Sequence, residues 1–585
     1  MSRVLGPSRA VTAASAALML LAASCAASRL PSSAERSPAT APAATAPPAA
    51  AGRAAAGGLP ALNIAEREAR DLGPVSPNMA VSVTLTLRGR DPAGLQSLVA
   101  RGKRVTPATF AATYGPSPEV VSQLRHILAR AGISSQWLSG EVSLSAGAPA
   151  ADIERFFHVG VHNFLLSGNT RFYAPLREPR VPAAIARSVL AVTGLDNYPS
   201  YSTFAIPSTT GLTPSQIATF YNMTPLRNAG IDGTGVTVMF PEWVVPDQAT
   251  LDAFAKKFNL PPFNLSVRAN PSAWGAPATS SNQSYWEAEG EATMDLEIVH
   301  GLAPGAKEVV YSLGNPGDLP LTLEAMVRDH PGAVMSSSIG NLNCELEPGA
   351  KQDSTALNAV FEQAASEGIS IFWASGDRGA FACLPGGDPA IEYSVSVDPG
   401  ADSPYLTGVG GTTAFVSSTG AYFKEAAWGE PVSQWGSGGG VSTLYSRPSW
   451  QDAPGTASLT GRGVPDVAAD ADGVSGWDTF SPTPNGPVEG PNGGTSAAAP
   501  CWASVTALVD QYLMQQHLHT VGFANPALYL FARDPKVPAP AFHQITEGSN
   551  LHYPATPGWN PATGLGSPDV AHLADDFVWY DHTHG

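Results

Sequence analysis

From about residue 205 onward, short apolar runs alternate with stretches that have helical spacing. The runs are VTVMF, KEVVYSL, AVMSSSIG and ISIFWASG, and the stretches between them include ATLDAFAKKFNL and STALNAVFEQAASEG. Strands separated by helices pair in parallel, because each crossover helix returns the chain to the same end of the sheet. The pattern therefore predicts an α/β domain over residues 201–585, with a parallel sheet flanked by helices. Active sites in such domains lie beyond the carboxyl ends of the strands.

A second, smaller domain is predicted before it. MAVSVTLTL alternates like a half-buried strand, and PSPEVVSQLRHILARAG has a Ser-Pro-Glu start, helical spacing and a Gly stop. AADIERFFHV has the pattern of a second short helix, and the strand-like VHNFLL follows it. This order predicts a small α+β domain, ferredoxin-like, over residues 66–200.

The first 65 residues have the pattern of an export signal and a spacer. Two arginines precede the apolar run Val11–Ala23, which is shorter than a transmembrane helix. We therefore expect a signal peptide at 1–25 and a secreted protein. Cys25 could carry a lipid anchor to the cell envelope; the alternative is ordinary signal cleavage nearby. Residues 26–65 are rich in Ala, Pro and Ser, which predicts a flexible linker.

Charge and sulfur content exclude several classes of function. The formal net charge is −17, which argues against nucleic acid or an anionic membrane as the partner. After the signal only Cys344, Cys383 and Cys501 remain, so the chain is neither a disulfide scaffold nor a zinc-cluster protein. Cys344 and Cys383 both follow strand-like runs, and we expect them to be bridged, with Cys501 free.

The segment NGGTSAAAPCWASVTALVDQYL contains a candidate nucleophile. Gly493 and Gly494 permit a tight turn, and we expect Pro500 in the first turn of the helix that follows. Ser496 would then lie at a helix N-terminus, where free N–H groups favour a developing oxyanion. The alternative interpretation is that the Gly-Thr-Ser turn only caps the helix.

Three carboxylates accompany this serine. Glu291 and Asp295 are four residues apart, so they share one helix face and raise each other's proton affinity. No lysine lies nearby to pair with them, although a solvated acidic face remains the alternative. Asp377 ends the run ISIFWASGD, at the carboxyl end of a predicted strand. Taken alone, Asp377 could instead cap a turn.

Together these motifs resemble the sedolisin family of serine-carboxyl peptidases. The motifs are Glu291-xxx-Asp295, Ser375-Gly376-Asp377 and Gly494-Thr495-Ser496, and their order and spacing match together. VTPATFAATYGPSPEVVSQL and RVPAAIARSVLAVTGLDN resemble the activation domain of the family. LAPGA, TGVGGTTAF, SGGGVSTLYSRPSWQ, RGVPDVAADAD and GWNPATGLGSP resemble its catalytic domain. The resemblance implies a subtilisin-like fold.

The resemblance also implies roles for individual residues. Ser496 matches the nucleophile, Glu291 the general base and Asp295 the carboxylate behind it. Asp377 matches the acid that serves as oxyanion donor. Glu242, in VTVMFPEW, falls where some members have another Glu that extends the hydrogen-bond chain.

The implied function is that of a secreted, acid-acting endopeptidase made as a self-processing proenzyme. Its partners would be protein or peptide substrates and its own prodomain, with a processing cut within 197–213 and a monomeric state. A tripeptidyl-peptidase of the same family and an inactive secreted binding protein are the alternatives. His300-Gly301 faintly resembles the histidine motif of a Ser-His-Asp peptidase, but no His-Gly-Thr-His follows.

The sequence departs from the family at two places. The family's calcium positions are occupied here by Gln544, Ile545, Thr556, Gly558 and Asn560. Calcium relies on carboxylate charge, and both expected aspartates are amides, so we expect calcium binding to be lost or weak and no cofactor to be required. A direct hydrogen bond between the two amides could close the loop instead.

The second departure is at Ile339, which replaces an aromatic residue of the family beside the substrate groove. This replacement predicts a different subsite preference.

Overall fold

The computed structural model describes residues 69–165, 171–177, 179–197, 211–268, 283–313, 318–340, 344–347, 350–383, 391, 393–417 and 420–584. All of them belong to one compact unit, Gly52–Gly585. The predicted signal peptide with Cys25, the linker at 26–65 and most of the predicted processing region lie outside the described residues. Within the described ranges, no helix combines the length and apolarity that a membrane crossing needs.

The larger part of the described chain is built on an eight-stranded sheet. Its order is β14-β13-β12-β11-β8-β10-β9, with β19 paired to β13. Neighbouring strands are parallel except β14, which runs antiparallel to β13. The strands are β8 (Thr237–Glu242), β9 (Leu265–Arg268), β10 (Lys307–Ser312), β11 (Val334–Ser337), β12 (Ser370–Ala374), β13 (Thr407–Val416), β14 (Tyr422–Ala427) and β19 (Val467–Asp470). The four apolar runs thus form β8, β10, β11 and β12, which confirms the predicted α/β fold.

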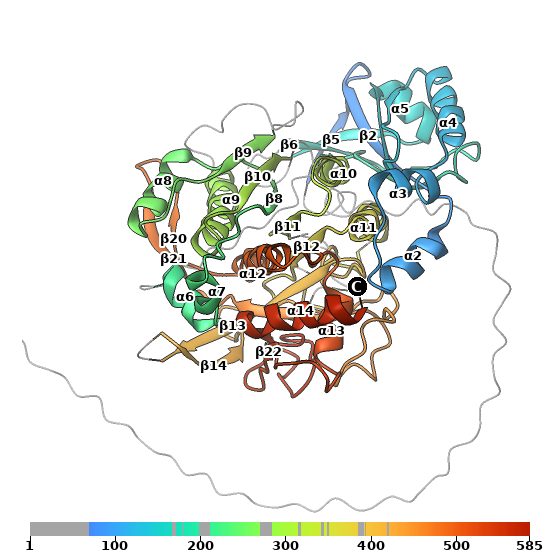
Figure 1. Ribbon diagram of the computed structural model, residues 1–585. Coiled ribbons are helices and arrows are strands. Elements are labelled where there is room, and N and C mark those ends of the chain that lie inside the picture. Colours follow the sequence, from blue (N-terminus) through green and yellow to red (C-terminus); the bar gives the residue numbers. More distant parts are fainter. Residues whose placement is uncertain are drawn as a thin grey trace, which may run out of the picture. The chain divides into compact units, whose positions relative to one another are not determined.

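Helices cover both faces of this sheet. In Figure 1, α10 and α11 lie on one side of β11 and β12, and α12 lies on the other, where it packs against α9. Because α12 is apolar around most of its circumference, it is buried along nearly its whole length. The helices are α6 (Pro214–Phe220), α7 (Thr224–Asn228), α8 (Gln248–Lys257), α9 (Gln283–Leu302), α10 (Leu319–Asp329), α11 (Ala350–Ser366), α12 (Thr495–Gln515), α13 (Asn525–Phe531) and α14 (Val570–His584).

Short two-stranded ribbons complete this domain. They pair β15 (Gly429–Glu430) with β16 (Trp435–Gly436), β17 (Gly440–Val441) with β18 (Gly463–Val464), β20 (Trp477–Ser481) with β21 (Val488–Asn492), and β22 (Phe542–His543) with β23 (Ser567–Pro568).

The N-terminal domain has a core of its own around an antiparallel sheet of order β3-β4-β2-β7. With α4 after β2 and α5 after β4, the order is β-α-β-β-α-β, which confirms the predicted ferredoxin-like α+β fold; the two strands between the helices, β3 and β4, were not identified from the sequence pattern. A second sheet has the order β1-β5-β6. The elements are β1 (Arg70–Pro74), β2 (Ala80–Leu87), α2 (Pro92–Ala100), α3 (Pro107–Thr113), α4 (Pro118–Arg130), β3 (Ser134–Gln136), β4 (Ser143–Pro149), α5 (Ala150–Phe157), β5 (Val161–Leu165), β6 (Arg171–Pro175) and β7 (Val189–Thr193).

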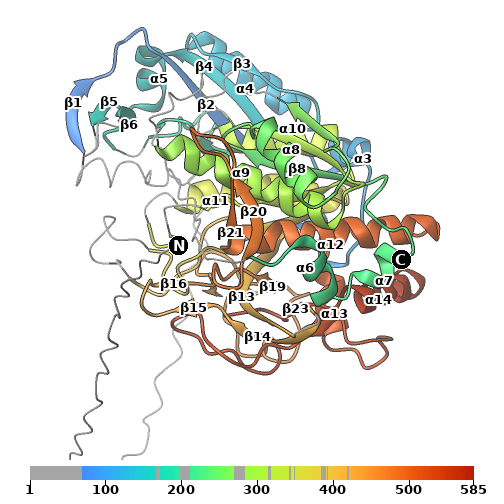
Figure 2. The same ribbon diagram turned by 90° about the vertical axis from the view of Figure 1, so that its left-hand side faces the viewer.

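The ferredoxin-like sheet rests on two helices of the larger domain. Strand β4 contacts α10 and strand β7 contacts α11. Figure 2 shows β4 and the rest of the N-terminal domain next to α10. Glu324 of α10 accepts a hydrogen bond from the Val142 N–H at 2.5 Å, and the side-chain amide of Gln352 in α11 donates to the Val192 carbonyl. Side chains of the larger domain thus bond to backbone groups just before β4 and within β7.

The cysteine prediction is confirmed. Cys344 and Cys383 form a disulfide with a Cα–Cα distance of 4.8 Å, and Cys501 is a free, buried cysteine in α12. The bridge links the chain beyond the end of β11 to the chain beyond the end of β12, at the edge of the sheet where functional side chains were expected.

Candidate active site

The predicted site residues gather at the carboxyl edge of the parallel sheet. Glu242 is the last residue of β8, and Ser338 follows the last residue of β11. Asp377 lies three residues beyond the end of β12. Because these strands are neighbours and run in parallel, their ends meet at one edge. The other residues come from two packed helices: Glu291 and Asp295 from α9, and Ser496 from α12.

Ser496 lies in the first turn of α12. Gly494 precedes the helix with φ 93° and ψ 161°, a conformation that residues with a side chain rarely adopt. The sequence predicted Pro500 in the first turn of the helix, and this is wrong: Pro500 is the sixth residue of α12. Its missing N–H would have bonded to the carbonyl of Ser496, four residues earlier. Pro500 therefore leaves the Ser496 carbonyl without a partner from its own helix.

Ser338 bonds to that carbonyl. Its hydroxyl lies 3.1 Å from the Ser496 carbonyl oxygen and 2.8 Å from each carboxyl oxygen of Asp295. One serine thereby connects the nucleophile turn to the carboxylate helix. No local sequence pattern predicts this contact, because it joins residues 158 positions apart.

Glu242 and Asp295 form a buried carboxyl pair. Asp295 is fully buried and Glu242 is 4% exposed, and a hydrogen bond joins the two side chains. Burial raises the pKa of both groups well above the usual range, and each is raised further by a neighbouring carboxylate: Glu291 for Glu242, and Glu242 for Asp295. The pair therefore retains a proton over the acid range.

Glu291 completes the carboxylate group one helical turn before Asp295. It is 9% exposed, more than Asp295, and its charge acts on Glu242. Neither Glu291 nor Asp295 lies on a solvated acidic face, so that alternative interpretation is wrong. Glu291 is thus the carboxylate of this group that lies nearest to solvent, with two buried carboxyl groups behind it.

Asp377 presents one bonded and one free oxygen. Its Oδ1 accepts hydrogen bonds from both the N–H and the hydroxyl of Thr495, each at 2.7 Å. Its Oδ2 is buried and has no hydrogen-bond partner among the described residues. Burial raises the pKa of Asp377 to about 6, although the two bonds from Thr495 act against the rise. Below that pH the proton belongs on Oδ2, because Oδ1 already accepts two donors.

A glycine-rich ribbon fixes the loop that carries Asp377. The Gly436 N–H donates to the Asp377 carbonyl at 2.9 Å, and the Gly438 N–H donates to the Gly376 carbonyl at 2.6 Å. A Cβ on Gly438 would lie 1.9 Å from the Ser375 carbonyl oxygen, so no larger residue fits without moving the loop. The SGGG segment therefore supports the predicted oxyanion donor through its backbone.

His300 is not part of the site. It is fully buried in α9 and stacks on Phe263. Its Nε2 lies 2.7 Å from the Pro261 carbonyl, and its Nδ1 lies 3.4 Å from a carboxyl oxygen of Glu308. Both ring nitrogens thus face structural partners, which argues against a Ser-His-Asp triad with this histidine.

The amides at the expected calcium positions bond to backbone groups and not to each other. The Asn560 amide N–H donates to the Thr556 carbonyl at 3.1 Å, and its oxygen accepts from the N–H groups of Ala562 and Thr563. Gln544 accepts from the Gly558 N–H at 3.4 Å. The suggested direct bond between Gln544 and Asn560 is therefore wrong.

Two family models match this chain. Residues 67–198 match the family described as the pro-kumamolisin activation domain, and residues 276–521 match the subtilase family. Kumamolisin from Bacillus sp. (strain MN-32) is 31% identical over 552 residues, which cover 86% of this chain and 92% of kumamolisin.

Two further relatives extend the similarity. Sedolisin from Pseudomonas sp. (strain 101) is 27% identical, and the match covers 87% of this chain and 90% of that protein. Tripeptidyl-peptidase 1 from Bos taurus is 26% identical, and the match covers 86% of this chain and 92% of that protein. Among solved structures, Pseudomonas sedolisin, a serine-carboxyl proteinase complexed with two molecules of pseudo-iodotyrostatin, superposes with a TM-score of 0.55 at 26% identity and covers 65% of this chain and 100% of its own.

The link between Ser338 and Pro500 yields a double-mutant test, carried out in chains that also carry Ser496→Ala to prevent cleavage. Ser338→Ala leaves the Ser496 carbonyl unbonded and should lower the free energy of unfolding by about 1–3 kcal/mol. Pro500→Ala restores a helix N–H to that carbonyl, so Ser338→Ala should cost at least about 1 kcal/mol less in that background.

Denaturant unfolding of the four chains measures this difference. The bond from Ser338 to Asp295 is lost equally in both backgrounds, so it cancels from the comparison. Equal costs of Ser338→Ala with and without Pro500 would show that the Ser496 carbonyl does not depend on Ser338.

Proposed function

Because the chain belongs to the sedolisin family of serine-carboxyl peptidases, we propose that it is a secreted proenzyme whose peptidase domain cuts internal peptide bonds of proteins in acid. The observation that carries this proposal is the free Oδ2 of Asp377, held beside the Ser496 turn by Thr495. A neutral carboxyl group in that place is a hydrogen-bond donor for an oxyanion, and it exists only in acid.

The chemistry follows the roles of the four side chains. Glu291 accepts the hydroxyl proton of Ser496 as the oxygen attacks the carbonyl carbon of the substrate. Asp377 donates to the oxyanion of the tetrahedral intermediate. Glu291 then protonates the leaving amine, and water resolves the acyl-enzyme by the same steps in reverse order. Asp295 orients Glu291, and Glu242 holds Asp295, as a third group does in any triad.

Carboxylates suit this task in acid where a histidine would not. Imidazole is protonated below its usual pKa of about 6.5 and cannot then serve as a base. A carboxylate, whose usual pKa is about 4, stays ionised to lower pH than imidazole stays neutral. Glu291 is the least buried of the three carboxyl groups, and the Glu242–Asp295 pair lies behind it. Its lower burial, compared with Glu242 and Asp295, supports the assignment of Glu291 as base.

The precursor organisation supports a self-processing zymogen. We infer that the prodomain at 66–200 covers the peptidase domain until the chain is cut within 197–213, and that the mature protein is a secreted monomer or is held to the envelope through Cys25. Tripeptidyl-peptidase action remains the second candidate because a named tripeptidyl-peptidase is among the relatives. An inactive binding protein is disfavoured, because every matched catalytic position is intact.

Calcium does not fit the residues at the family's metal positions. The Thr556 carbonyl, a candidate ligand, accepts the amide N–H of Asn560, and Gln544 brings no charge. Within the described ranges, no group of three or more His, Cys, Asp or Glu side chains is arranged to hold a metal ion. We therefore propose that no step and no part of the fold requires calcium.

The pH profile tests the role of Asp377 and the mode of cleavage together. On a peptide with an acetylated N-terminus, internal cleavage should fall as pH rises through about 6, because Asp377 then ionises and stops donating. Asp377→Asn keeps an N–H donor at every pH, so this decline should disappear. Asp377→Ala should lose about 10²–10³-fold in kcat at all pH values.

Two results would contradict this account. A decline near pH 6 that persists in Asp377→Asn would assign the titration to another group. Cleavage only of peptides with a free N-terminus, three residues at a time, would replace the endopeptidase by the tripeptidyl-peptidase.

Metal independence has its own measurement. The melting temperature should be the same in excess calcium and in excess chelator, at a pH where the chelator works. Asn560→Ala should cost about 1–3 kcal/mol, because two buried N–H groups lose their acceptor, whereas the exposed Gln544→Ala should cost little. The double replacement of Gln544 and Asn560 by Asp should introduce a calcium-dependent rise. A clear rise in the unaltered protein would refute this proposal.

A further inference from the structure

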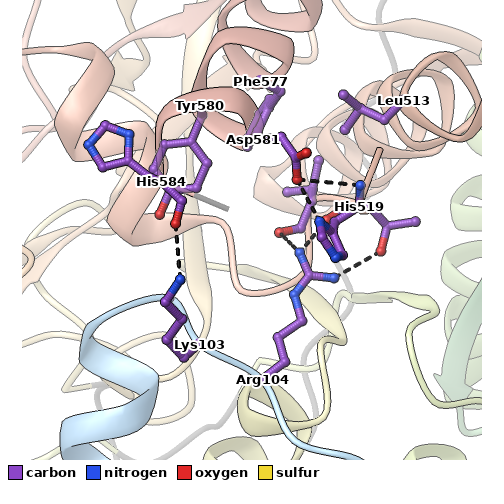
Figure 3. Close-up of a pocket in the computed structure, with 11 residues that line it drawn as sticks. Lys103, Arg104, Leu513, His519, Phe577, Tyr580, Asp581 and His584 are labelled. Atoms are coloured by element: carbon purple, nitrogen blue, oxygen red, sulfur yellow. Dashed lines mark hydrogen bonds and ion pairs between the residues drawn. The ribbon is translucent and has the colours of Figure 1, made fainter. Parts of the chain in front are cut away.

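The segment that follows α2 lines a pocket together with the peptidase domain. This cavity of about 210 Å³ lies between the segment and the chain around the end of α12 and around α14. Figure 3 shows Lys103 and Arg104 pointing into it from the N-terminal domain. The Lys103 ammonium donates to the His584 carbonyl at 3.0 Å, and the Val105 N–H donates to the Ser366 carbonyl at 2.8 Å. The segment is therefore attached on both sides of Arg104.

The guanidinium of Arg104 meets a set of oxygen acceptors. It donates to the Thr520 hydroxyl and the Val521 carbonyl, each at 3.1 Å, and also to the Thr520 carbonyl. A planar guanidinium with five N–H donors can bond to several carbonyls at once, which an ammonium group cannot do with the same geometry. The arrangement of acceptors is thus suited to a guanidinium group in particular.

Two glycines make room for this side chain. A Cβ on Gly522 would lie 2.8 Å from the guanidinium carbon, and a Cβ on Gly368 would lie 2.9 Å from Cδ of Arg104. Both glycines have positive φ, 63° and 80°. The two glycines therefore form the walls of a slot on the peptidase domain into which Arg104 inserts.

Two carboxyl groups, Asp510 and Asp581, lie close enough to the Arg104 guanidinium to interact with its charge. Asp510, 1% exposed, accepts the Val521 N–H at 2.7 Å and so fixes the turn that presents the carbonyls. Asp581 accepts from His519 at 2.7 Å on the other side of the pocket. Burial raises the pKa of Asp510 to about 7, and the charge of Arg104 counteracts that rise, so each group favours the charged form of the other.

The slot is remote from the proposed catalytic residues. Asp510 follows Ser496 by fourteen residues on the same helix, which places them about 21 Å apart along its axis. A ligand in the slot therefore does not occupy the position of the scissile bond.

We propose that the peptidase domain carries a guanidinium-binding site at Thr520, Val521 and Gly522, filled by Arg104 in the precursor and open to arginine side chains of other protein chains once the prodomain leaves. The first part, the site filled by Arg104, is supported by contacts within the full chain. The second part rests on the proposed function, since it requires the prodomain to be cut off.

Chemical rescue tests the first part in the full chain with Ser496→Ala, which removes any effect of cleavage. Replacing Arg104 by Ala should raise the hydrogen-exchange rate of the Val105 amide by about tenfold, because the segment loses its central attachment. Guanidinium chloride at about 10 mM should fill the vacated slot and restore most of the exchange protection of the Val105 amide, whereas sodium chloride at the same concentration should not. Arg101→Ala is the matched control, because the Arg101 side chain donates to Ser97 of its own domain and, among the described residues, to no group of the peptidase domain.

The outcomes separate the two proposals. Unchanged exchange in Arg104→Ala, or equal restoration by sodium chloride, would overturn the guanidinium site whether or not the protein is a peptidase.

For the acid-processed protein, a synthetic peptide of residues 99–106 should bind, and the same peptide with citrulline in place of Arg104 should bind at least about tenfold more weakly. Equal binding of the two peptides would overturn the second part. A precursor that never processes would count against the proposed function and leave the rescue experiment valid.

Discussion

Removal of carboxyl groups from water is the physical constraint on which this site depends. Glu242, Asp295 and Asp377 are all at least 96% buried, and burial is the largest cause of the raised pKa of each. The parallel sheet makes this burial possible, because it collects the ends of β8, β11 and β12 at one edge beneath α9 and α12. A carboxyl group held in that way stays neutral in mild acid and can donate a hydrogen bond, which an exposed aspartate could not do.

The same edge is held together by polar contacts between distant parts of the chain. Pro500 removes a helix bond from the Ser496 carbonyl, and Ser338 supplies the replacement while also contacting Asp295. Thr495 contacts Asp377 in a similar way from the residue before Ser496. The nucleophile turn is thus connected to both acidic groups by short hydroxyl side chains.

Sequence patterns predicted the elements that are strongly periodic. The four apolar runs became β8, β10, β11 and β12, and the helix from Pro118 to Arg130 was found from its start and stop residues. The helices α2 and α3 were missed, although Asp91 and Thr106 cap them just before a proline. The roles of Ser338 and Thr495 could not be predicted, because they depend on contacts across more than a hundred residues that no local pattern contains.

Self-processing of the purified precursor in acid tests the central claim most directly, namely that Ser496 is the nucleophile of a carboxylate-activated site. The precursor with Ser496→Ala should remain intact when it is incubated alone in acid, with an unchanged fold. Ser504→Ala, on the same helix, should process normally, because the Ser504 hydroxyl donates to the Pro500 carbonyl and contacts none of the proposed catalytic groups among the described residues. Normal maturation of the Ser496→Ala precursor in isolation would contradict the account.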